Sequence, residues 1–142
     1  MNEGDKITTE DLIENWNRIL KFYDSLIDQN LKLRPIRFLV RYIIEQEYSK
    51  EIYGGTSLYN LLLSLPTENK IDYTKTLQVE YDQLTQTVKL NYHDKPRNER
   101  TKENRDWTIE CQATEIVDTF EHFLNEHEDW KKIKKARHAN NT

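Results

Sequence analysis

The chain has 142 residues, of which 36% are hydrophobic, 11% aromatic and 32% charged, with a formal net charge of −4. This length favours a single domain, the aromatic content disfavours wholesale disorder, and three Gly and three Pro are too few for a β-sandwich. Cys111 is the single cysteine, which excludes an internal disulfide and a cysteine metal cluster. No apolar run approaches the roughly 18 residues of a membrane span, and the N-terminus lacks a secretory signal pattern. We therefore expect a cytoplasmic protein without a membrane segment.

Apolar residues at helical spacing predict a first helix from about residue 9 to residue 28, with Thr8 or Thr9 as its cap. On this helix Asn15 falls outside the apolar stripe and is expected to face water. A second helix is predicted from Pro35, because proline suits a first helical position. The stripe of the first helix comprises Leu12, Trp16, Ile19, Leu20, Tyr23 and Ile27.

Two structures compete for residues 57–65. The residues Leu58, Leu61, Leu62 and Leu65 have the i, i+3, i+4, i+7 spacing of a short helix. The pair Thr56-Ser57 suits the start of such a helix, and Pro66 suits its end. The alternative is a strand in which Tyr59, Leu61, Leu63 and Leu65 share one face. The agreement of the start and stop signals favours the helix.

The apolar period changes to two from Ile71 onward, which predicts a strand over 71–81, a reversal, and a returning strand over 88–92. Residues 94–105 contain no apolar residue apart from Pro96 and are predicted to form a mobile basic loop. A third strand is predicted over 107–112. A last helix is expected from Thr114 to about Trp130, and the basic tail 131–142 is expected to fray.

The predicted fold is therefore α+β, with a small antiparallel three-stranded sheet, helices packed on one of its faces, and the order ααα-βββ-α. One domain is expected over 1–142, with an ordered core from about 8 to 130.

Candidates for chemistry are weak. His122 and His127 are five residues apart, about 140° around a helix, and so cannot share a metal as an i, i+4 pair does. His93 and Asp94 are adjacent on a strand and point to opposite faces. Cys111 alternates with apolar residues and is expected to be buried and inert. The sequence predicts no catalytic residue, no metal site and no cofactor, which favours a non-enzymatic role.

Two sets of basic or aromatic residues are candidates for nucleic-acid binding. Tyrosines between residues 42 and 59, together with Arg37 and Arg41, resemble a stacking surface, and the Arg97–Arg105 loop and Lys131–Arg137 tail are basic. Amphipathic tyrosines at the margins of helical stripes are more simply explained by packing. Nucleic acid is therefore disfavoured as a partner.

The charge is segregated along the chain. Residues 106–130 hold eight acidic residues and no Lys or Arg, whereas 95–105 carry +3 and 131–142 carry +5. These segments either neutralise one another or leave an acidic surface for a basic protein partner, with Glu115, Asp118 and Glu121 as its candidate residues.

The leading hypothesis is a non-enzymatic interaction domain that binds a basic protein. Small acidic α+β proteins of this class include many immunity proteins, an analogy that rests on no residue motif. The alternative is a small-molecule-binding or catalytic domain with a pocket between sheet and helices. An edge strand also offers a surface for self-association.

Overall fold

The computed structural model describes residues 4–140 of the chain and the side chains of residues 4–134. The helices of this range are α1 (Thr9–Asp28), α2 (Arg34–Glu45), α3 (Ile116–Glu126) and α4 (Glu128–Asn140). Its strands are β1 (Tyr53–Ser57), β2 (Asn60–Ser64), β3 (Lys75–Asp82), β4 (Thr87–Asp94) and β5 (Trp107–Gln112). Short 3₁₀ segments are η1 (Tyr48–Lys50), η2 (Arg97–Glu99) and η3 (Ala113–Glu115).

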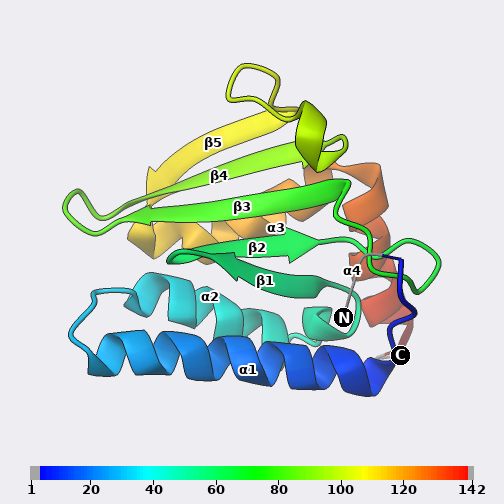
Figure 1. Cartoon of the computed structure of the whole chain (residues 1–142), viewed down its shortest axis with the longest axis horizontal. Coiled ribbons are helices and arrows are strands. Elements are labelled where there is room, and N and C mark those ends of the chain that lie inside the picture. Colours follow the sequence, from blue (N-terminus) through cyan, green and yellow to red (C-terminus); the bar gives the residue numbers. More distant parts are fainter. Residues whose placement is uncertain (1–3, 141–142) are drawn as a thin grey trace.

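The strands form one antiparallel sheet in which each strand pairs with the next along the chain, from β1 to β5. The helices cover one face of this sheet and run beside β1, and the other face is left open apart from loops (Figure 1). The predicted α+β class is therefore correct. The predicted three-stranded sheet and the order ααα-βββ-α are wrong, because residues 4–140 contain five strands in the order ααβββββαα.

The largest error concerns residues 57–65, for which the sequence favours a helix. These residues belong to the hairpin of β1 and β2, with Leu58 in its turn at a positive φ of 55°. Leu61 of β2 lies opposite Val79 of β3, and both Leu61 and Leu63 are completely buried. A helix of two turns is marginal on its own, whereas pairing with β3 satisfies the backbone and buries alternate leucines on the helix-covered face.

Two boundaries also differ from the prediction. β3 begins at Lys75 rather than at Ile71, because Ile71 packs against the N-terminal segment outside the sheet. The predicted helix over 114–130 is two helices, which separate at His127, where φ is −123° and ψ is 115°. The second of them, α4, extends the helical structure into the basic tail.

The first helix, the antiparallel pairing of β3 with β4, and β5 follow the prediction. Thr8 caps α1, since its hydroxyl accepts a hydrogen bond from Asp11 N at 3.1 Å and Asp11 accepts one from Thr8 N at 2.9 Å. Local signals suffice here because caps and period-two alternation act within a few residues.

The core fills the space between the sheet and the helices, where the sequence analysis considered a ligand pocket. Aliphatic side chains of the helices and strands pack there around large aromatic ones. No helix within residues 4–140 is both long and apolar enough to cross a bilayer. The largest fully buried aromatic side chains are Trp16, Trp130, Tyr23, Tyr48, Phe120 and Phe123.

The outer edge of β1 is closed by α1. Asn15 Nδ2 donates to the carbonyl of Gly54, and Asn15 Oδ1 accepts from the N–H of Gly54, both at 2.9 Å. Trp16 Nε1 donates to the Ile52 carbonyl at 2.7 Å. The expectation that Asn15 faces water is therefore wrong: its side chain replaces a strand partner, and the residue is only 6% exposed.

Candidate functional site

The three carboxylates predicted to bind a partner lie along the beginning and middle of α3. Glu115 accepts a hydrogen bond from the backbone N–H of Gln112 at 3.0 Å, and Asp118 is exposed. Glu121 is half-buried, and the Tyr48 hydroxyl donates to it, lying 2.7 and 2.8 Å from its two oxygens. Glu121 therefore helps to hold α3 against η1, whereas Glu115 and Asp118 are at the surface.

β5 is the last strand of the sheet, and its outer side faces away from β4 (Figure 1). The N–H of Ala113 donates to the carbonyl of Gln86 at 3.1 Å, which sets the phase of the antiparallel ladder. Because hydrogen-bonded and non-bonded pairs alternate, every second residue of β5 points its N–H and C=O groups outward. These residues are Thr108, Glu110 and Gln112.

One of the outward groups, the N–H of Gln112, donates a hydrogen bond to the carboxylate of Glu115. The backbone groups of Thr108 and Glu110 remain on the outer side. Since α1 closes the β1 edge, β5 is the open edge of the sheet within residues 4–140.

The histidine candidates lie apart from one another. His122 forms an exposed pair with Glu126 at 3.4 Å, and His93 Nε2 lies 2.9 Å from the carbonyl of Thr101. No group of three or more His, Cys, Asp or Glu among the described side chains is arranged to hold a metal ion.

Cys111 and His127 lie on the helix-covered side of the sheet. Burial raises the pKa of the Cys111 thiol, although a hydrogen bond with Thr119 opposes the shift. The rings of Tyr92 and Phe123 pack against His127 at centroid distances of 4.8 and 4.5 Å. Burial lowers the pKa of His127, and its Nε2 is buried without a hydrogen-bond partner among the described residues.

The arginines considered for nucleic-acid binding are engaged with carboxylates. Arg37 forms an ion pair with Asp24, and Arg41 lies 3.6 Å from Glu45. Tyr48, one of the candidate stacking residues, is completely buried. The contacts of Arg37, Arg41 and Tyr48 therefore do not strengthen the case for nucleic-acid binding by this region.

The basic loop 95–105 folds over the open face of the sheet. Arg100 donates to the carbonyl of Tyr73, and the Arg97 guanidinium lies 5.1 Å from the centre of the Tyr73 ring. Asn104 ties the loop to itself through both ends of its side chain. The loop therefore contributes side chains to the open face, and its mobility stays a prediction.

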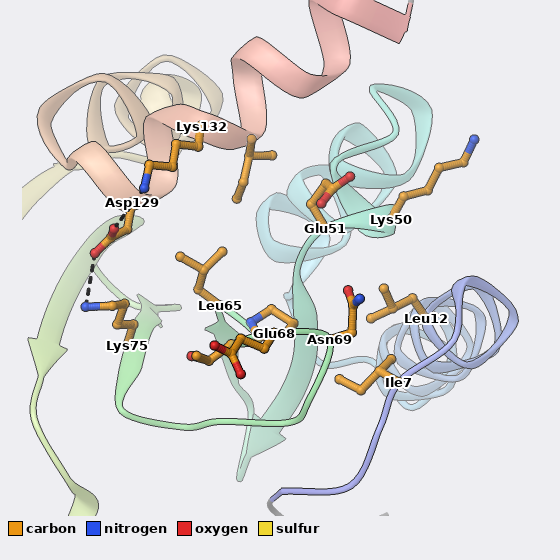
Figure 2. Close-up of a pocket in the computed structure, with 13 residues that line it drawn as sticks. Ile7, Leu12, Lys50, Glu51, Leu65, Glu68, Asn69, Lys75, Asp129 and Lys132 are labelled. Atoms are coloured by element: carbon orange, nitrogen blue, oxygen red, sulfur yellow. Dashed lines mark ion pairs between the residues drawn. The ribbon is translucent and has the colours of Figure 1, made fainter.

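A hollow of about 480 Å³ lies where α4, the β2–β3 connection and the N-terminal segment meet (Figure 2). Lys75 lies at one side of it, beside Asp129, and forms ion pairs with Asp129 at 3.0 Å and Asp94 at 2.8 Å (Figure 2). Burial alone would lower the pKa of Lys75, but its hydrogen bonds to these carboxylates raise it. The central charges are thus paired with one another and tie β3 to α4.

A second hollow, of about 380 Å³, lies on the open face of the sheet beneath the basic loop. Its walls come from β1 and the loop, and its floor from the outward side chains of β2, β3 and β4. Arg97 and Arg100 contribute positive charge, and none of the described residues that line it is acidic. Its polar floor and wall residues include Ser64, Thr76, Gln78, Asn91 and His93.

The floor is more deeply buried than an open sheet face ordinarily is. Ser64, Thr76 and Asn91 are 3%, 6% and 1% exposed. The alternation that predicts this strand gives no sign of the site, because Thr76 and Gln78 take its polar positions, alternating with Leu77 and Val79. The one local signal in the sequence is the loop after β4, which holds five basic residues. The position of this loop over the sheet is set by the tertiary structure and cannot be predicted from the loop's own residues.

No family model matches the chain, and neither a curated protein nor a solved structure is significantly similar to it.

Proposed function

We propose that the chain is a non-enzymatic, cytoplasmic protein-binding domain that pairs the open edge of β5 with an extended, basic segment of a partner protein. The outward backbone groups of Thr108 and Glu110 carry this proposal. An unpaired edge strand is a template for a further strand, and main-chain hydrogen bonds then supply affinity.

The edge has defined ends. At one end, the outward N–H of Gln112 already donates a hydrogen bond to Glu115. At the other end, the strand begins directly after the loop that ends at Asp106. A partner segment of about five residues fits this length at roughly 3.4 Å per residue.

The charge around the edge favours a basic partner. Glu110 lies on the open face, and Glu115 lies at the end of the edge, beside the N–H of Gln112. The charges of both carboxylates favour a raised pKa of the Cys111 thiol. Asp118 adds an exposed carboxylate at the start of α3. Complementary charge speeds association and excludes wrong partners.

Self-association through the same edge is less favourable. Antiparallel pairing of two β5 strands brings the carboxylates of both copies together, and like charges that face each other across strands destabilise a pair. Sedimentation of the isolated chain at low salt is therefore expected to show a monomer.

The experiment is a quantitative affinity capture from the native cell extract with the wild type and matched variants. Glu110→Pro removes an outward N–H without removing a ladder hydrogen bond, and proline is tolerated on edge strands. Asp118→Asn removes one carboxylate only. Glu14→Gln, on the exposed side of α1, is the charge control.

We expect a basic protein to be retained by the wild type and by Glu14→Gln, to be recovered less with Asp118→Asn, and to be lost with Glu110→Pro. The bound partner should also slow hydrogen exchange at the N–H groups of Thr108 and Glu110. Equal recovery with Glu110→Pro and wild type, or recovery of no specific protein, would refute the proposal.

A further inference from the structure

The floor of the open-face hollow contains a short chain of hydroxyl hydrogen bonds. Thr76 Oγ1 donates to the carbonyl of Tyr73 at 2.7 Å, and Ser64 Oγ lies 2.8 Å from Thr76 Oγ1. Because Thr76 has one hydroxyl proton and uses it on Tyr73, Ser64 must donate to Thr76. These two hydroxyls are therefore satisfied within the protein.

Asn91, beside them on β4, is satisfied at one end only. Its Oδ1 accepts from the Thr108 hydroxyl at 2.8 Å. Its Nδ2 is buried and has no hydrogen-bond partner among the described residues, although the residue lines the hollow and is only 1% exposed. A buried donor without a partner destabilises the folded chain, so the presence of Asn91 at this position indicates that an acceptor binds there.

The charge of the wall indicates which acceptor suits the hollow. The Arg97 guanidinium is exposed at the rim and stacks on Tyr73. Arg100 is anchored by the carbonyls of Tyr73 and Lys95, so its charge stays in place at the wall. With two guanidinium groups and no carboxylate among the described lining residues, the hollow favours an oxyanion.

We propose that this hollow is a binding site for a small organic anion, in which Asn91 Nδ2 donates to a carboxylate or phosphate oxygen and Arg97 neutralises the charge. Asn91 lies in the floor of the hollow and Arg97 at its exposed rim, so a ligand that contacts both enters from the side of the loop. The site lies on the open face of β2–β4, and the edge of β5 is not part of it.

The test is a titration of the isotope-labelled full chain by NMR, with inorganic phosphate and with acetate as separate probes and sodium chloride at matched ionic strength as the reference. We expect one or both probes to shift the side-chain amide signals of Asn91 saturably, and chloride not to do so. A response to phosphate alone assigns a phosphorylated ligand, and a response to acetate alone assigns a carboxylate.

Three variants sharpen the test. Arg97→Gln is expected to weaken the probe at least about tenfold, since a charge-assisted hydrogen bond is lost. Arg18→Gln, on the exposed side of α1, removes the same charge elsewhere and should leave affinity unchanged. Asn91→Leu should abolish binding while the thermal midpoint stays the same or rises, because it removes the unsatisfied donor.

The proposal is overturned if neither probe gives a saturable shift, or if chloride gives the same shift. It is also overturned if Arg97→Gln and Arg18→Gln bind the probe equally. A marked fall of the thermal midpoint in Asn91→Leu would make the amide a structural group and would contradict the proposal as well.

Discussion

Replacement of Asn15 by alanine tests the central feature of this fold, the closure of the β1 edge by a side-chain amide. In the folded chain Asn15 exchanges two hydrogen bonds of 2.9 Å with the backbone of Gly54, and both residues are buried. Alanine leaves the N–H and the C=O of Gly54 without these partners. Each unsatisfied buried group costs about 1–3 kcal/mol, so we expect a loss of about 2–6 kcal/mol in the free energy of unfolding.

The assay is urea unfolding followed by tryptophan fluorescence, with the free energy extrapolated to water. Asn17→Ala is the matched control, because Asn17 lies on the same helix and is exposed, and alanine has the higher helix propensity. This control is expected to be as stable as the wild type or slightly more so. Hydrogen exchange at Gly54 N–H should accelerate in Asn15→Ala alone.

The reasoning is refuted if Asn15→Ala unfolds within about 0.5 kcal/mol of the wild type, the range of ordinary surface substitutions. It is also refuted if Asn17→Ala is destabilised equally, since the loss would then belong to the helix rather than to the edge.

Three further predictions concern stability. Gly54→Ala should lower the free energy of unfolding by about 1–3 kcal/mol, because an added Cβ would lie 3.0 Å from Trp16 Cζ2; an unchanged urea midpoint would contradict this. Burial lowers the pKa of His127 below its ordinary 6.5, so the unfolded chain binds this proton more readily. Stability should therefore fall as the pH falls through about 6.5, less steeply in His127→Phe, and superimposable pH profiles would count against it. Glu121→Ala should lower the free energy of unfolding in urea by about 1–2 kcal/mol, because the hydroxyl of the completely buried Tyr48 loses the carboxylate to which it donates. Equal stability of the variant and the wild type would show that this hydrogen bond is dispensable.

The sequence predicted the acidic partner-binding surface only in part. The acidic character of residues 106–130 is a matter of composition, and the exposure of Asp118 follows from helical spacing. The bond between Glu121 and Tyr48 joins residues 73 positions apart, and no local pattern encodes such a pairing. The sequence therefore grouped Glu121 with two surface carboxylates, although it also has a packing role.

The open-face hollow depended still more on tertiary structure. Thr76 and Asn91 occupy the polar positions of alternating strands, which the period of two correctly places opposite the core. Both residues are nevertheless buried, and Tyr73 together with Arg97 and Arg100 of the basic loop lines the same hollow. A loop without apolar residues has no hydrophobic periodicity from which its position can be predicted.

By itself the sequence determined the α+β class, the helix over residues 9–28 and the strand over 107–112, because capping and side-chain periodicity act within a few residues. The tertiary structure alone decided residues 57–65 and Asn15. The leucines there fit both a helical and a strand period, and only pairing with β3 made the strand the better structure. Asn15 lies outside the apolar stripe, and only the approach of β1 gave its amide two backbone partners. In both cases the deciding hydrogen bonds join segments distant in the sequence, so their free energy is absent from any local pattern.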